Sequence, residues 1–125
     1  MMKPTFLHGS RRPLLVCLIG DMTDPAGCIA TMRGAMYDGA DAFAIHLDRL
    51  DRKYHTIEDL TGIFNYAADK PVMAIIHRTG SAANLTDEEI VATHLLALEA
   101  GATMCDILGD MFDPSPMELS RKPAA

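Results

Sequence analysis

Four short apolar runs, each followed by a stretch with helical spacing, constrain the fold of this chain more than any other feature. The runs cover residues 13–20, 42–48, 71–79 and 103–110. Every position of residues 14–19 is apolar, which is typical of a strand buried on both faces of a parallel sheet. Because strands that alternate with helices indicate a parallel sheet joined by crossover helices, we predict an α/β fold.

Capping signals mark the ends of the intervening helices. The predicted helices cover residues 24–36, 56–67 and 86–101, and residues 114–125 are expected to begin a fourth. Asp24 is a good N-cap because it precedes Pro25, which is tolerated in the first helical turn. Thr86 and Glu89 have the spacing of a capping box, and Gly101 is suited to end the third helix.

Composition excludes several classes of partner. The formal net charge is -6 and no cluster of Lys and Arg interleaves with aromatic residues, so we expect no nucleic-acid partner. We also expect no membrane association, because a spanning helix needs about 20 apolar residues and the longest apolar run has the length of a strand. Cys17, Cys28 and Cys105 lack metal-ligand spacing, which indicates buried free thiols in a reducing, cytoplasmic compartment.

A barrel and a doubly wound sheet are the two architectures that such repeats can build. A doubly wound sheet usually carries a glycine-rich phosphate loop after its first strand, and residues 20–24 have no such pattern. Gly-Ala precedes both the second and the fourth strand, as a weak internal repeat. We therefore predict the first half of a TIM (β/α)8 barrel over residues 13–125, incomplete at its C-terminus, after an irregular lead-in over residues 1–12.

Polar residues follow the apolar runs at the strand ends, where active sites of parallel α/β folds gather. His46 and Asp48 are two residues apart on one strand and should face the same way. Asp48 and Asp110 have a structural alternative, since Asp at a strand end also stabilises turns. Arg78 ends a strongly apolar strand, where a guanidinium needs an anionic partner.

The other histidines are expected to contribute less to a site. His8 and His55 fall in loops and His94 falls within a helix, so we interpret these three as surface or packing residues. His77 lies at a strand end and is a weaker candidate for the site. A mixed nitrogen and oxygen metal site is an alternative use of four strand-end residues: His46, Asp48, His77 and Asp106. No dense ligand motif supports it, so we predict no metal and no cofactor.

The order of strand-end residues resembles the N-terminal half of a type I 3-dehydroquinate dehydratase, over roughly residues 13–110. The resemblance rests on a Lys-Pro-led strand over residues 70–79 that ends in His-Arg-Thr, a glycine-bearing loop, a helix with an acidic first turn, and a strand after Gly-Ala that carries Asp106. The family has Glu-x-Arg-x-Asp on its second strand and Asp-x-Glu on its fourth. This chain keeps Asp48 and Asp106 but has Ala44, His46 and Leu108 at the other three positions.

The resemblance implies a lyase that dehydrates a cyclic keto acid through an imine, as in the shikimate route to aromatic amino acids. Arg78 would bind the substrate carboxylate, Asp48 and Asp106 with His46 would hold its hydroxyl groups, and Asp110 is a further candidate. The lysines (Lys3, Lys53, Lys70 and Lys122) are not placed to form the imine, and no histidine follows His94. No catalytic residue is therefore assigned, and we expect this segment by itself to be inactive.

Two alternatives remain open. The chain can belong to a divergent barrel enzyme that acts on another small oxo-acid, with or without a metal. It can also be a non-catalytic half-barrel that binds or assembles with a partner. In every case a lone four-stranded sheet leaves two open edges, so we expect self-association.

Overall fold

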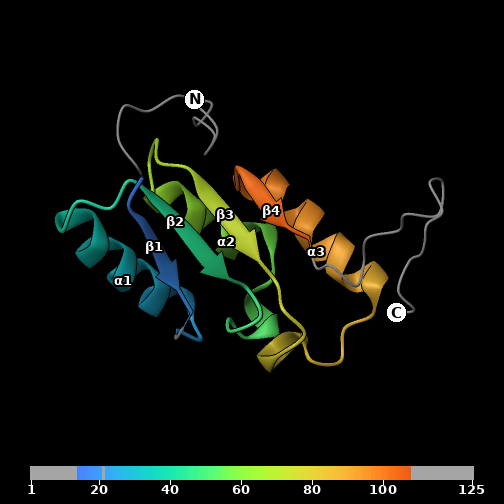
Figure 1. Cartoon of the computed structure of the whole chain (residues 1–125). Coiled ribbons are helices and arrows are strands. Elements are labelled where there is room, and N and C mark those ends of the chain that lie inside the picture. Colours follow the sequence, from blue (N-terminus) through green and yellow to red (C-terminus); the bar gives the residue numbers. More distant parts are fainter. Residues whose placement is uncertain (1–13, 21, 108–125) are drawn as a thin grey trace.

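The computed structural model describes residues 14–20 and 22–107 (Figure 1). They form four strands and three α-helices in strict alternation, with two short 3-10 helices. In chain order the elements are β1 (Val16–Ile19), α1 (Pro25–Tyr37), β2 (Ala42–His46), η1 (Arg52–Tyr54), α2 (Ile57–Tyr66), β3 (Val72–Ile75), η2 (Gly80–Ala82), α3 (Asp87–Ala100) and β4 (Met104–Asp106). The predicted α/β alternation is confirmed over these residues.

The strands are shorter than the apolar runs that predicted them. Residues 47–48 and 76–79 leave the sheet and enter loops that contain η1 and η2, which the sequence did not predict. The expected lead-in, the expected fourth helix and Asp110 lie outside the described residues. The shortening matters for function because Asp48 and residues 77–79 belong to loops, whereas His46 and Asp106 keep ladder positions at the strand ends.

The helices begin at the capping residues that the sequence predicts. Asp24 Oδ1 accepts a hydrogen bond from the backbone N–H of Gly27 at 2.7 Å, and the capping box of Thr86 and Glu89 is complete. Such caps are each worth about 1 kcal/mol. Gly101 has a φ of 120°, which favours glycine, and it ends α3 directly before β4.

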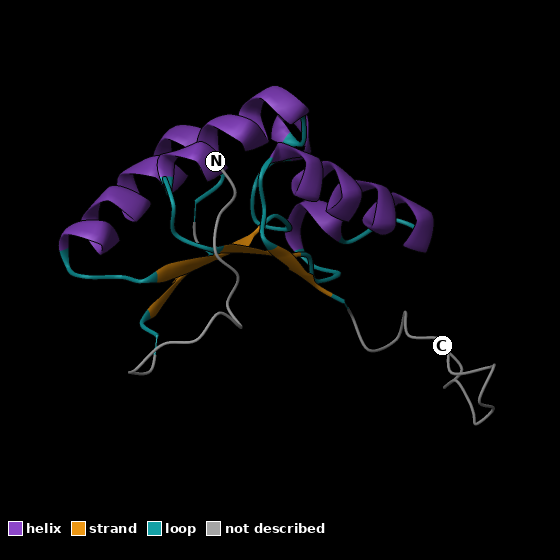
Figure 2. Ribbon diagram, turned by 90° about the horizontal axis from the view of Figure 1, so that it is seen from above, coloured by secondary structure: helices purple, strands orange, loops and turns teal. Residues whose placement is uncertain are grey.

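All four strands are parallel and lie in the order β1-β2-β3-β4. The three helices cover one side of this sheet, and the other side carries no helix among the described elements (Figure 2). When all crossover connections have the same handedness and each new strand is added at the same edge of the sheet, the connecting helices lie on the same face of the sheet. A doubly wound sheet reverses its stepping direction and has helices on both sides, so its pattern differs from the one seen here.

The core lies between the sheet and the helices. Phe43 and Ile45 of β2 are fully buried, as is Phe64 of α2. Parallel register places Leu18, Ala44, Met73 and Met104 side by side on the helix-free face. Leu18 on that face is 62% exposed. Burial of one large apolar side chain is worth about 1.5–3 kcal/mol, so the helical side stabilises the fold.

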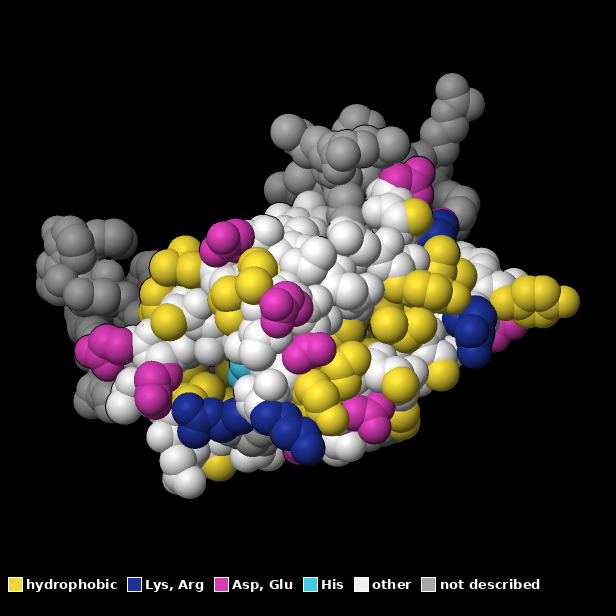
Figure 3. Space-filling model, turned by 180° about the vertical axis from the view of Figure 1, so that it is seen from behind, with side chains coloured by type: hydrophobic (Ala, Val, Ile, Leu, Met, Phe, Trp, Pro, Cys, Tyr) yellow, Lys and Arg dark blue, Asp and Glu magenta, His cyan; other side chains and the backbone are white. Residues whose placement is uncertain are grey.

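The helical side of the molecule presents patches of hydrophobic side chains between acidic ones (Figure 3). Val91, Leu95 and Leu98 of α3 are among the exposed large hydrophobic residues. Within residues 14–20 and 22–107, no helix combines the length and the apolar character that crossing a membrane requires.

Candidate functional site

Polar side chains gather at the carboxyl ends of the strands, on the helix-free face. His46 is the last residue of β2 and Asp106 the last of β4, and both are in register with Ile75 of β3 between them. His77 follows Ile75 by two residues, and its ring lies 5.1 Å from the ring of His46 in an edge-to-face arrangement. We call His46, Asp48, His77 and Asp106 the strand-end cluster.

The closest contact within the strand-end cluster joins His46 to Asp48. Nδ1 of His46 lies 3.2 Å from Oδ1 of Asp48, and Asp48 is only 1% exposed. Oδ2 of Asp48 accepts a hydrogen bond from the hydroxyl of Thr79 at 2.7 Å. The Arg49 guanidinium also lies 3.6 Å from this oxygen. The predicted pairing of His46 and Asp48 is therefore present.

The charge state of Asp48 follows from these contacts. Burial by itself raises the pKa of the Asp48 carboxyl, but hydrogen bonds from Thr79, the His77 backbone, His46 and its own backbone amide together hold the pKa below its usual value. Because an ionised carboxylate only accepts hydrogen bonds, Nδ1 of His46 must carry the proton that joins them. Nε2 is then the basic nitrogen of a neutral His46, which is the arrangement of a general base.

The ends of β3 and β4 are more open. Nε2 of His77 lies 4.0 Å from Oδ2 of Asp106, and both side chains are 48% exposed. Because both side chains are open to water, solvent or a ligand can replace this contact. Asp106 therefore offers an accessible carboxylate one strand away from the pair of half-buried His46 and buried Asp48.

Two glycines lie beside the strand-end cluster. A Cβ on Gly20, just after β1, would stand 3.4 Å from the ring of His46, which is an ordinary van der Waals contact. Gly80 has a φ of 54° and approaches the backbone carbonyl of Asp48 so closely that any side chain would overlap it. The loop after β3 thus packs directly on the loop after β2, which brings Thr79 to Asp48.

Arg78, the strongest single candidate from the sequence, is not directed at the strand-end cluster. Its guanidinium donates to the backbone carbonyl of Leu85 at 3.3 Å and pairs with Asp87 in the first turn of α3. The expectation that this arginine needs an anionic partner is confirmed, and the partner in this structure is an acid of the same chain.

The remaining polar candidates occupy different places. His55 lies in a loop as expected, and its Nε2 is 2.9 Å from the carbonyl of Leu47, so it holds the loop after β2 in place. His94 is buried in α3, and neither ring nitrogen has a hydrogen-bond partner within the part of the chain described. Its burial lowers its pKa, against a smaller opposing effect of Asp106. The interpretation of His94 as a packing residue fits this position.

Thr79 is the residue of this region to which the sequence analysis gave no role. It lies in the same His-Arg-Thr segment as Arg78, and a hydroxyl two residues after a strand-end histidine was the available signal. Among the described residues, no group of three or more His, Cys, Asp or Glu side chains is arranged to hold a metal ion. The imidazole and carboxylate groups of the strand-end cluster are able to hydrogen-bond and to exchange protons.

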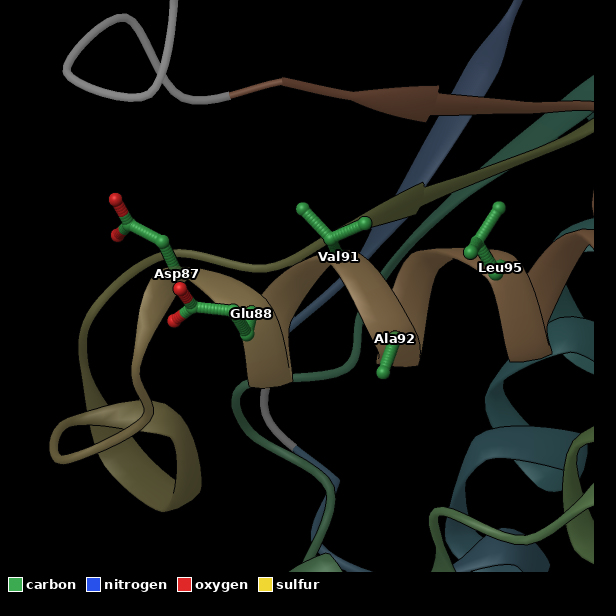
Figure 4. Close-up of a pocket in the computed structure, with 5 residues that line it drawn as sticks. All are labelled: Asp87, Glu88, Val91, Ala92 and Leu95. Carbon is green, nitrogen blue, oxygen red and sulfur yellow. The ribbon is translucent and has the colours of Figure 1, made fainter.

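An apolar hollow lies elsewhere, on the outer surface of α3 (Figure 4). Asp87, Glu88, Val91, Ala92 and Leu95 line it. The side chains of Val91 and Leu95 point in the same direction, and both carboxylates lie at the start of the helix (Figure 4). This surface holds no histidine or cysteine and is distinct from the strand-end cluster.

The cysteines are free thiols. Burial, with a smaller contribution from Asp24, raises the pKa of Cys28 to about 11. Cys17 and Cys105 are half-buried, and burial raises the pKa of both. The prediction of buried thiols is thus confirmed for Cys28 and only partly right for the other two.

Taken together, the described residues define an α/β protein with a parallel sheet and a polar cluster at its carboxyl edge. Comparison with protein-family models, with curated proteins and with solved structures finds no significant match.

Proposed function

We propose that this chain supplies the substrate-binding half of a (β/α)8-barrel lyase that dehydrates a cyclic, hydroxylated keto acid, in the manner of a type I 3-dehydroquinate dehydratase. The observation that carries the proposal is the position of the strand-end cluster. His46 and Asp106 end parallel strands on the face that has no helix among the described elements, and Asp48 and His77 contact them there. In a barrel this place is the mouth, where active sites of the fold are found.

The cluster contains the groups that a polyhydroxylated substrate requires. Asp106 accepts hydrogen bonds from substrate hydroxyl groups, and its exposure leaves it accessible. Asp48 is buried and fixes the ring of His46, so that Nε2 of His46 exchanges a proton with a hydroxyl or an α-carbon of the substrate. Charge-assisted hydrogen bonds of this kind are worth about 1.5–3 kcal/mol each.

Arg78 binds the substrate carboxylate in this proposal, and it must exchange Asp87 for that carboxylate. The side chain of Arg78 is 31% exposed, and that of Asp87 is 57% exposed. Because this ion pair is open to solvent, a substrate anion competes for the guanidinium without uncovering a buried charge. Removal of the Asp87 charge should therefore favour the substrate.

The proposal assigns no imine step to the described residues. Lys53 lies in η1, with its ammonium 5.2 Å from the ring centroid of Tyr54. Lys70 precedes β3, at the opposite end of the strands from the strand-end cluster. Lys70 is thus remote from the site and the Lys53 ammonium lies against the Tyr54 ring, so the chain's part of the reaction is binding and proton transfer.

The test is a titration of the chain with 3-dehydroquinate, followed through the imidazole NMR signals of His46 and His77. We expect both signals to shift. Asp106→Asn should weaken binding roughly tenfold, since tenfold corresponds to about 1.4 kcal/mol. Asp69→Asn is the matched control, because Asp69 is an exposed acid in the turn that precedes β3. This control should bind as the wild-type chain does.

A third variant examines the role of Arg78. Asp87→Asn should tighten binding of the keto acid severalfold, because the substrate carboxylate no longer competes with a protein carboxylate. A titration in which neither histidine signal moves, or in which Asp106→Asn and Asp69→Asn behave alike, contradicts the proposed site. Weaker binding by Asp87→Asn contradicts the role of Arg78 alone.

A further inference from the structure

Most exposed large apolar residues among the described ones lie at the two lateral edges of the sheet, β1 and β4, or on α3, the helix next to β4. Nine large hydrophobic side chains are exposed among the described residues. Leu15, Val16 and Leu18 belong to β1 or immediately precede it, and Ile107 immediately follows β4. Val91, Leu95 and Leu98 belong to α3, the helix that leads into β4.

By contrast, Ala42 and Ala44 of the inner strand β2 are buried on the same face as Val16 and Leu18.

Both lateral edges of the sheet also lack a strand partner in the described part of the chain. β1 pairs only with β2, and β4 pairs only with β3. An edge of this kind presents backbone donors and acceptors that favour pairing with a further strand. Residues 14–19 carry no charged side chain, so the β1 edge lacks the charges that usually prevent such pairing.

We propose that two copies of this chain associate edge to edge, with β4 of each copy paired to β1 of the other, and so close a parallel eight-stranded barrel. A two-fold axis that runs along the strands preserves their direction, so both new pairs are parallel like the pairs within each sheet. Because the two junctions are equivalent, the assembly closes and leaves no edge.

A second copy fits better than an arbitrary partner because each chain carries both halves of the junction. An axis perpendicular to the strands would pair β1 with β1 in antiparallel fashion and leave both β4 edges open. Closure also covers the helix-free face. Leu18, Met73 and Met104 form one row across that face, and such layers of side chains fill the interior of a closed barrel.

The assembly also places two copies of the site beside each other. Since all strands of both copies point the same way, the strand-end cluster of each copy lies at the same mouth. The dimer therefore presents two sets of His46, Asp48, His77 and Asp106 around one opening. This inference rests on the exposed surfaces and open edges, and it stands whether or not the chain binds a keto acid.

Sedimentation velocity of the 125-residue chain tests the association without any ligand. We expect a single species of twice the 13.6 kDa of one chain. Leu18→Glu should convert it to a folded monomer, because Leu18 is exposed in one copy but lies inside the closed barrel. Tyr37→Glu is the matched control, since Tyr37 is 92% exposed at the end of α1. This variant should remain a dimer.

Leu95→Glu separates edge pairing from association through α3, and it should also remain a dimer. A monomeric wild-type chain, a polydisperse one, or a dimer that only Leu95→Glu dissociates overturns the proposal. Hydrogen exchange of the wild-type chain decides the matter if Leu18→Glu fails to fold. The amides of β1 and β4 should lose protection on dilution before those of β2 and β3, and equal protection at all concentrations contradicts edge pairing.

Discussion

Nδ1 of His46 lies 3.2 Å from Oδ1 of Asp48, although only His46 belongs to a strand and the two residues differ in exposure. Asp48 is held in the loop after β2 by Thr79, which comes from the loop after β3. The pair therefore depends on the packing of two loops that are 31 residues apart in sequence. Its geometry sets the proton position on His46 and, through this, the chemistry available at the carboxyl edge.

Loss of the Asp48 charge should destabilise the fold. In Asp48→Asn, the side chain keeps one acceptor, its amide oxygen, whereas its NH2 group only donates. Of the two groups that hydrogen-bond to the Asp48 carboxylate, His46 and Thr79, one therefore loses its acceptor. We expect a loss of about 1–3 kcal/mol in the free energy of unfolding, measured by urea denaturation. Asp51→Asn, a change at an exposed acid of the same loop, is the control and should alter stability little. Equal midpoints for the two variants would show that the Asp48 contacts contribute no stability.

The same carboxylate should give the chain an acid-sensitive stability. The pKa of Asp48 is lower in the folded chain than in the unfolded chain, so the unfolded chain binds more protons. The contribution of the Asp48 carboxylate to the free energy of unfolding is present above the usual Asp pKa of about 3.9. It is lost as pH falls through the lower pKa of the folded chain. The stability difference between the wild-type chain and Asp48→Asn should therefore shrink between about pH 5 and about pH 3. A difference that is constant over this range would contradict the assigned charge state.

His94 should make a second, separate contribution to pH dependence. Burial lowers the pKa of His94 in the folded chain, because the folded chain favours the neutral ring. The fold therefore has its full stability above the ordinary histidine pKa of about 6.5, where the ring is neutral in both states. That stability is lost as pH falls from there toward the folded-state value. His94→Leu should remove this slope and raise stability at low pH, because no ring nitrogen then remains without a partner.

His94→Gln separates the titration of His94 from its polarity. Glutamine does not titrate but keeps buried polar atoms, so this variant should lose the pH slope without the gain in stability. Thermal unfolding at about pH 5.5 and about pH 8 measures both quantities, on either side of the ordinary histidine pKa. A slope that persists in both variants would assign the effect to another group.

Gly80 should tolerate no side chain. Gly80→Ala places a Cβ against the backbone carbonyl of Asp48 and also strains a positive φ, so the loops after β2 and β3 must separate. Gly39→Ala is a matched control, because Gly39 has a φ of 97° but no atom within 4 Å of the added Cβ. We expect a loss of about 1–2 kcal/mol for Gly39→Ala and clearly more for Gly80→Ala, measured by urea denaturation. Similar losses would show that the loop contact is easily relaxed.

Much of the fold was predictable from local sequence. The apolar runs predicted the strands, but the prediction of burial on both faces is wrong for β1, because Val16 and Leu18 are exposed on the face that carries no described helix. The caps at Asp24 and Thr86 predicted the starts of α1 and α3. The pairing of His46 with Asp48 was expected from the two-residue repeat of a strand, but Asp48 lies in the loop after β2, where its contact with Thr79 and not a strand repeat holds it beside His46. The ends of the strands were predicted too late, because apolar residues such as Leu47 and Ile76 continue the runs into loops where they are still buried.

The direction of Arg78 was not predictable from its own position. The sequence indicated that its charge needs a partner, but both a ligand and a nearby acid satisfy that need. Only the course of the loop from β3 to α3 places Asp87 within reach. The burial of His94 was likewise hidden, because a histidine at helical spacing does not by itself show which face of the helix packs on the sheet.

The sequence by itself determined that this protein alternates strands and helices, where those helices start, and that polar residues follow each strand. Tertiary structure alone decided that the strands lie in consecutive order with their described helices on one side, and that His46, Asp48, His77 and Asp106 meet at one edge. The physical reason is that apolar periodicity and capping act between residues close in sequence. Strand order and the packing of one loop on another depend on contacts between residues that lie dozens of positions apart.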